Sequence, residues 1–283
     1  MKYNEARFKA SHNSYDREDL SVTQQLEWSN VNPHYGGCRG LELDLVQRRL
    51  KHDGDPWRWS VSHGGRYKDA ADRQFHYFLK ILKTWAERHP SHQVITLTLD
   101  LKSQHGDHAE FPGRFDHYVS RALGRDRILT PRDVIGPHPD LVTATVHGAW
   151  PTLRDLRGHF ILCLSGHPTR KATYAGMNPR KRLCFAGDKR VNPPTHGHRA
   201  FFNFFMPADK LDAATRIQIL RGFADQGFIT RAFGLNDRRA WDRAQRGGAN
   251  ILATNHVTKK TWARAGCNPF EERDGPRSKQ MEC

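Results

Sequence analysis

The sequence predicts an α/β protein, a single TIM-type β/α barrel with some distortion. Three observations lead there: eight strand-like segments, helical patterns between several of them, and polar residues at the ends of strand-like segments. A barrel places its chemistry at strand ends, because these ends face one shared mouth. A chain of 283 residues is long enough for one large domain. We therefore expect residues 1–283 to form one barrel domain, with a polar C-terminal tail from about residue 257.

The expected strands are short apolar segments spaced along the whole chain. Residues 94–99 and 160–164 are rich in strand-forming apolar residues, as in strands that are buried on both faces. The complete set of expected strands covers residues 6–11, 38–46, 94–102, 159–166, 183–187, 201–206, 228–233 and 250–255.

Helical spacing of apolar residues lies between several of these strands. Residues 75–85, 211–223 and 237–246 each show it, with Pro90, Gly227 or Gly247 beyond the end. Some crossovers are short, which is why we expect a distorted barrel. Residues 103–158 contain many Pro, Gly and His residues, and we expect them to carry helices and an insertion over the mouth.

Composition restricts the possible partners. The net charge is +15 with 17 histidines, so the surface attracts phospholipid headgroups, nucleic acids or acidic proteins. No apolar run is long enough to span a membrane. No signal peptide is visible at the start. The five cysteines have no CxxC spacing, and we expect Cys163 and Cys184 to be core residues.

The first candidate site residues follow the first two expected strands. His12 and Asn13 end the first strand, and a histidine there can take a proton from an alcohol. Glu42 and Asp44 alternate along the second strand, so both carboxylates point to one face. Two carboxylates on one face of an apolar strand repel each other unless a cation or protons separate them. A metal site explains this pair better than a solvated surface strand does.

Two further candidates complete the set. His63 precedes Gly64 and Gly65, which allow a sharp turn that would expose the imidazole to an open cavity. Asp100 ends a buried strand, where an unpaired charge is costly. Lys102 lies on the same face and can contact either Asp100 or a phosphate. Oxygen ligands suit calcium, and an acid/base pair beside a metal suits phosphoryl transfer on a phosphodiester.

These motifs resemble the catalytic half of calcium-dependent phosphatidylinositol-specific phospholipase C, in its single-domain bacterial form. The resemblance covers about residues 6–102. It rests on His12-Asn13, on Glu42 and Asp44 in Arg-Gly-Leu-Glu-Leu-Asp, on His63-Gly64 and on the acidic residue at position 100. Animal enzymes usually have glutamate at that last position. The spacing from Asp44 to His63 is also longer than in the family, through an apparent insertion at residues 51–57.

The resemblance implies both a metal and a mechanism. Calcium would be held by Asn13, Glu42, Asp44 and Asp100. The inositol 2-hydroxyl would attack phosphorus while His12 takes its proton, although Glu42 could serve as base instead. His63 would protonate the leaving diacylglycerol oxygen. Lys102 and Arg231 would hold headgroup phosphates. The implied partners are a phosphoinositide and an anionic phospholipid membrane, and we expect a secreted or extracellular monomer.

Two other functions remain open at this stage. A glycerophosphodiester phosphodiesterase shares the Glu-x-Asp pair and the second histidine, but it usually opens with His-Arg-Gly, whereas this chain has His12-Asn13-Ser14. The second alternative is a catalytically inactive barrel that binds nucleic acid through its positive charge. Residues 180–182 and 189–190 are basic, but no nucleic-acid-binding module is recognisable, and we expect no nucleic-acid partner.

Overall fold

The computed structural model describes residues 1–17, 20–27, 38–49, 57–102, 109–176, 178–206, 212–257 and 262–263. Its strands are β1 (Phe8–Ser11), β2 (Gly40–Arg49), β3 (Trp57–Val61), β4 (Ile95–Leu101), β5 (Ile128–Leu129), β6 (Phe160–Gly166), β7 (Phe185–Asp188), β8 (Phe201–Phe205), β9 (Ile229–Phe233) and β10 (Ile251–Thr254). Its α-helices are α1 (Val22–Leu26), α2 (Phe75–Arg88), α3 (Phe111–Leu123), α4 (Pro131–Ile135), α5 (Leu141–Val146), α6 (Pro168–Gly176), α7 (Ala213–Ala224) and α8 (Arg238–Arg246).

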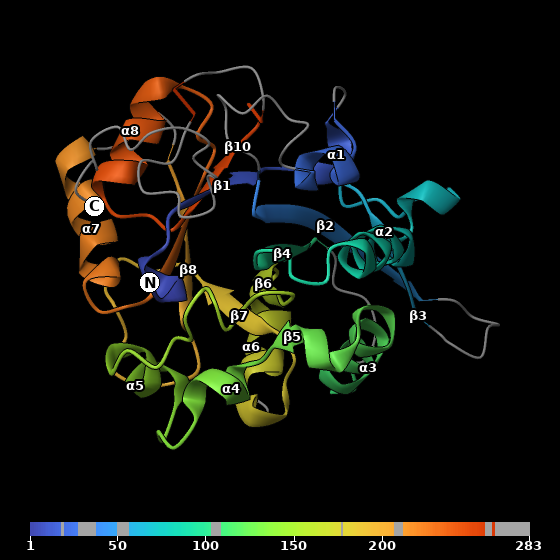
Figure 1. Cartoon of the computed structure of the whole chain (residues 1–283), viewed down its shortest axis with the longest axis horizontal. Helices are drawn as coiled ribbons and strands as arrows, with labels where there is room; N and C mark the ends of the chain where they lie inside the picture. The colour runs from blue at the N-terminus through green and yellow to red at the C-terminus, as the bar shows by residue number, and fades with distance from the viewer. Residues whose placement is uncertain are drawn as a thin grey trace.

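Eight parallel strands close into a barrel within the described part of the chain. Their order is β1-β10-β9-β8-β7-β6-β4-β2, and β2 returns to β1. Helices cover the outside, with α7 and α8 on one side and α2 and α3 on the opposite side (Figure 1). Each of the eight strands expected from the sequence is present, so the predicted fold class is confirmed.

The ring closes where β1 meets β2 over a short contact. Ala10 pairs with Gly40, and the backbone nitrogen of Arg39 donates to the carbonyl oxygen of Lys9 at 3.0 Å. A Cβ atom on Gly40 would lie 2.6 Å from the Cβ of Ala10, so glycine permits this approach. The closure holds the two strands that carry the first candidate residues side by side.

Strand β3 was missing from the sequence prediction. It runs antiparallel to the outer half of β2, with Val61 opposite Leu45. The long spacing between Asp44 and His63 therefore includes two antiparallel strand segments, residues 45–49 and 57–61, that pair with each other. Residues 50–56, which hold most of the predicted insertion, lie outside the described residues.

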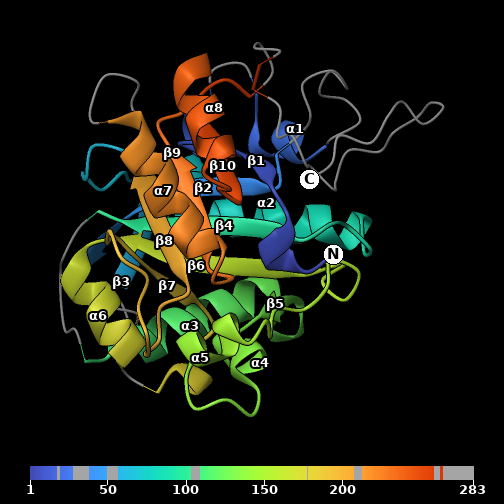
Figure 2. The ribbon, with the colours of Figure 1, turned by 90° about the vertical axis from the view of Figure 1, so that its left-hand side faces the viewer.

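Alternation along the barrel strands separates two apolar clusters. Leucines 41, 43, 97 and 99 face outward and pack with the buried faces of α2 and α3. Inward positions near the starts of the strands belong to a cluster that includes Phe8, Ile161 and Ile251, together with Tyr3 and Trp150. A third cluster lies under α7 and α8, which stand in front of the barrel strands in Figure 2.

The prediction that residues 103–158 insert over the mouth is wrong for the described part, residues 109–158. Leu141 and Val142 of α5 pack with Tyr3, which precedes the first strand, and β5 pairs with the start of β6. The nitrogen of Tyr3 also donates to the carbonyl oxygen of Pro151 at 3.0 Å. These apolar residues close the end of the barrel opposite the mouth, and α3 packs on its side.

The remaining expectations about the chain divide between confirmed and undescribed parts. Cys163 and Cys184 are buried, as predicted for core residues. Cys267 and Cys283 lie outside the described residues, as does nearly all of the polar tail. None of the described helices has the length and apolar character needed to cross a bilayer.

Gly166, the last residue of β6, offers a direct test of how the strand ends are packed. Its φ angle is 79°, and a Cβ atom there would lie 2.4 Å from the carbonyl oxygen of Leu101 and 2.7 Å from Oδ1 of Asp100. We expect Gly166→Ala to lower the free energy of unfolding by about 2 kcal/mol or more, from backbone strain and collision. Urea unfolding measures this change.

The matched control is Gly222→Ala in α7. No heavy atom lies within 4 Å of a Cβ atom at Gly222, so alanine there should be neutral or stabilise the helix by up to about 1 kcal/mol. Equal stabilities of the two variants would contradict the packing at Gly166.

Candidate functional site at the carboxyl ends of the strands

The barrel brings all eight candidate side chains of the sequence analysis to one end. Parallel strands end at the same edge, and the inward positions near that edge are polar. Asp44 of β2 stands directly beside Asp100 of β4 in the sheet register. Contacts connect all eight residues. Glu42 contacts Arg231, His12 and the backbone nitrogen of Asn13. The Asn13 side chain contacts His63, which leads on to Asp44, Lys102 and Asp100.

The two aspartates share one ammonium group. Nζ of Lys102 lies 2.5 Å from Oδ2 of Asp100 and 3.2 Å from Oδ2 of Asp44. Burial raises the pKa of the Asp44 carboxyl, and Lys102 only partly opposes that effect. At Asp100 burial also acts to raise the pKa, but Lys102, Arg231 and Ser165 together outweigh it, so the pKa lies below its ordinary value.

Glu42 is held from two directions. Its Oε1 lies 2.9 Å from Nη2 of Arg231 in an ion pair, and the Arg231 side chain is only 5% exposed. Its Oε2 accepts from the backbone nitrogen of Asn13 at 3.1 Å. Asn13 has a φ angle of 51°, a left-handed conformation that asparagine tolerates better than most residues. This backbone turn directs the start of the loop after β1 toward β2.

His12 is oriented by the last strand of the barrel. Its Nδ1 lies 2.8 Å from Oδ1 of Asn255, which directly follows β10. Because an amide oxygen only accepts, the Nδ1 of His12 carries the proton in this pairing. Nε2 is then the basic ring atom, and it lies 3.7 Å from Oε2 of Glu42. The ring of Phe233 stacks on the imidazole at 6.2 Å between centroids.

His63 is the more open of the two histidines. Its Nδ1 lies 3.0 Å from Oδ2 of Asp44 and 3.4 Å from Nδ2 of Asn13, while 63% of its side chain is exposed. The backbone nitrogen of Ser62 donates to the carbonyl oxygen of Asp44 at 2.9 Å, which fixes this turn against β2. One ring edge is thus held by the carboxylate, and the rest of the ring faces solvent.

Three contacting residues were missed in the sequence analysis. The hydroxyl of Tyr15 donates to Oδ2 of Asp44 at 2.9 Å, Asn255 pairs with His12, and Phe233 stacks on His12. Tyr15 lies within the same His-Asn-Ser-Tyr motif as His12, so the motif itself was a usable signal. Asn255 and Phe233 end or follow expected strands, and strand-end position was their only signal.

The donor set fits a hard cation, although these side chains are engaged by other groups. Oδ1 of Asp44 is buried and has no hydrogen-bond partner within the described residues. Carboxylate and amide oxygens are the ligands that calcium prefers. Within the described residues, no three acidic, histidine or cysteine side chains lie close enough together to hold a metal ion. Lys102 and Arg231 form ion pairs with the carboxylates.

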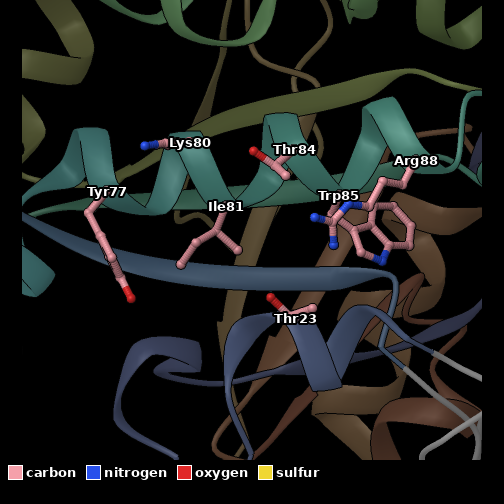
Figure 3. A pocket seen from close by; sticks show the side chains of 7 residues that line it. All are labelled: Thr23, Tyr77, Lys80, Ile81, Thr84, Trp85 and Arg88. Carbon is pink, nitrogen blue, oxygen red and sulfur yellow. The ribbon is translucent and has the colours of Figure 1, made fainter.

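Two surface pockets lie away from these residues. The groove in Figure 3 is lined by residues of α2 and by Thr23 of α1. Another pocket is lined by Arg7 and by residues at the C-terminal ends of α7 and α8. Neither of these two pockets is lined by any of the eight candidate side chains.

Solved structures share this fold. A calcium-dependent phosphoinositol-specific phospholipase C from Pseudomonas sp. is 20% identical, with a TM-score of 0.72 over 96% of this chain and 94% of that one. The same enzyme in a myoinositol complex gives a TM-score of 0.69, at 20% identity over 96% and 94% of the chains. A phosphatidylinositol-specific phospholipase C from Streptomyces antibioticus gives 0.65, at 19% identity over 92% and 98%. At such identities the likeness concerns the fold.

The family itself is shown by the sequence. No curated protein matches the chain. The sequence model described as phosphoinositide phospholipase C, Ca2+-dependent, matches residues 68–268, which include Asp100, Lys102 and Arg231 but not the motifs from His12 to His63. This match covers more than half of the chain, and the barrel agrees with it. The chain therefore belongs to the calcium-dependent phosphoinositide phospholipase C family.

Proposed function

We propose that this protein is a calcium-dependent phospholipase C that cleaves phosphatidylinositol into diacylglycerol and an inositol phosphate. The observation that carries the proposal is the network of contacts at the barrel mouth. It joins two histidines to three carboxylates and an asparagine amide. Membership of the family adds support, and the myoinositol complex of the Pseudomonas enzyme supports an inositol headgroup as the group bound.

The metal ligands would be Asn13, Glu42, Asp44 and Asp100. Their oxygens come from β2, β4 and the loop after β1, and the unpaired Oδ1 of Asp44 offers a ready acceptor. Bound calcium would lower the pKa of the attacking hydroxyl and stabilise charge on the phosphate. The contribution of the protein is to hold these oxygens on rigid strand ends.

The two histidines would carry the proton transfers. Nε2 of His12 accepts the proton of the substrate hydroxyl as its oxygen bonds to phosphorus, and Asn255 keeps Nδ1 protonated for this role. His63 donates a proton to the diacylglycerol oxygen as its bond to phosphorus breaks. Asp44 orients the ring of His63 for that donation. Lys102 and Arg231 supply positive charge at the same mouth, and we propose that they contact substrate phosphate.

The surface suits a substrate embedded in a membrane. The net charge of +15 attracts anionic lipid, and Phe205 at the end of β8 is 54% exposed. Phe205 also contacts Phe233, which stacks on His12, so an exposed apolar side chain lies close to the mouth. We propose an extracellular monomer that acts at anionic phospholipid surfaces.

Substrate choice is tested by assaying phosphatidylinositol and glycerophosphodiesters side by side, each with calcium or excess chelator. We expect turnover of phosphatidylinositol that requires calcium. Asp44→Asn should lower this activity at least about 10–100-fold, because a charged ligand of the metal is lost. The matched control is Asp69→Asn, since Asp69 is an exposed surface residue paired with Arg48.

Each alternative result has a distinct meaning. Faster turnover of glycerophosphodiesters would favour the related phosphodiesterase function. Full activity on phosphatidylinositol in excess chelator would refute the calcium requirement.

The roles of the histidines are tested by leaving-group chemistry. His12→Ala and His63→Ala should each lower the rate by about 10²–10⁴-fold, the usual contribution of a general acid or base. A substrate with a good leaving group should partly rescue His63→Ala, since protonation of the leaving oxygen then matters less. It should not rescue His12→Ala. Rescue of both variants, or of neither, would contradict the assignment.

The membrane role is tested by ionic strength. Each basic residue near an anionic surface adds roughly 1 kcal/mol of attraction, and salt screens it within a Debye length of about 10 Å at 0.1 M. Activity on vesicles should therefore fall steeply from low to physiological salt, while activity on a soluble short-chain substrate changes little. Equal salt responses would mean that the positive charge serves another partner, such as a nucleic acid.

A further inference from the structure

The ammonium group of Lys102 lies against the same two carboxylates, Asp44 and Asp100, that would bind a metal ion. Its Nζ lies 2.5 Å from Oδ2 of Asp100 and 3.2 Å from Oδ2 of Asp44, between side chains that the parallel register sets next to each other. Calcium ligands lie 2.3–2.6 Å from the ion. An ammonium group in this position and a calcium ion on the same two carboxylates would be forced into close, unfavourable charge contact.

The carboxylates are compensated from within the chain. Arg231 balances the charge of Glu42, and Lys102 supplies one positive charge that Asp44 and Asp100 share. Buried like charges without such partners would strongly disfavour the folded state. The barrel is therefore stabilised by its own cations, and a calcium ion on the same carboxylates must compete with one of them.

Lys102 is the cation that can leave. It directly follows β4, and its backbone nitrogen is fixed to the carbonyl oxygen of Leu45 at 2.9 Å. The side chain is 25% exposed and has a flexible four-carbon stem, so its head can move while the backbone stays. Arg231, by contrast, is almost fully buried, and its guanidinium also lies over the ring of Phe233.

We propose that Lys102 is an internal cation that competes with calcium: it occupies the Asp44–Asp100 pair in the metal-free protein and is released toward the mouth when calcium binds. This inference rests on the proposed calcium dependence. It makes Lys102 a determinant of metal affinity as well as a phosphate contact. The released ammonium group would then be available to an anionic substrate at the moment when the metal is in place.

The test is calcium binding to Lys102→Met, measured by isothermal titration calorimetry without substrate. The variant should bind calcium about tenfold or more tightly, because the competing charge is gone. In chelator its melting temperature should be about 3–6 °C lower, because the two aspartates then lack their partner. The matched control is Lys80→Met, at an exposed lysine of α2 beside the groove in Figure 3.

The outcomes separate this inference from the proposed function. Equal or weaker calcium binding by Lys102→Met would overturn the competition while leaving calcium dependence intact. Absence of calcium binding in both the unchanged protein and the variant would overturn both proposals. Tighter binding in Lys80→Met as well would show a general effect of net charge and would also overturn the assignment to Lys102.

The unchanged protein provides a second measurement, which is informative even if the variant does not fold. Acetylation by an amine-reactive ester, followed by mass spectrometry, reports how accessible each lysine is. Calcium should raise the labelling rate of Lys102 several-fold relative to that of Lys80. A rate that calcium leaves unchanged or lowers would contradict release of the ammonium group.

Discussion

Three carboxylates lie at one end of the barrel, two of them buried and the third, Asp100, half-buried. The rest of the site depends on how their charge is neutralised. Glu42, Asp44 and Asp100 come from the adjacent strands β2 and β4, so the register forces them together. Burial of like charges is costly without cations. Lys102 and Arg231 supply two, and the calcium requirement that we propose follows from the same demand for positive charge.

The two histidines are fixed by this same set of groups. His63 is held by Asp44, so any cation that binds Asp44 also acts on the ring that we propose as the acid. His12 also lies near Glu42, but its ring is oriented by Asn255, which follows β10, the other neighbour of β1. The barrel closure between β1 and its two neighbours thus aligns the two histidines and the three carboxylates around one mouth.

Much of this could be predicted from the sequence. Local signals placed all eight barrel strands and all eight candidate side chains, because strand pattern and strand-end position are properties of short segments. Contacts between residues on different strands leave no signal in a short segment. This explains why Asn255 was missed, and why the sequence did not decide whether Lys102 contacts Asp100 or a phosphate. The segment before β6 was misplaced because its Pro and Gly content is typical of a surface insertion. Its buried residues, such as Leu141 and Trp150, cover the opposite end of the barrel instead.

The central claim is that the carboxylate cluster at the mouth is a calcium site with Lys102 as its internal competitor. Anomalous diffraction from crystals grown with calcium tests it most directly. The account predicts a calcium peak bound by Glu42, Asp44 and Asp100, with Nζ of Lys102 withdrawn from both aspartates. The absence of a peak at the mouth, or a calcium ion bound there with Lys102 still between Asp44 and Asp100, would contradict it.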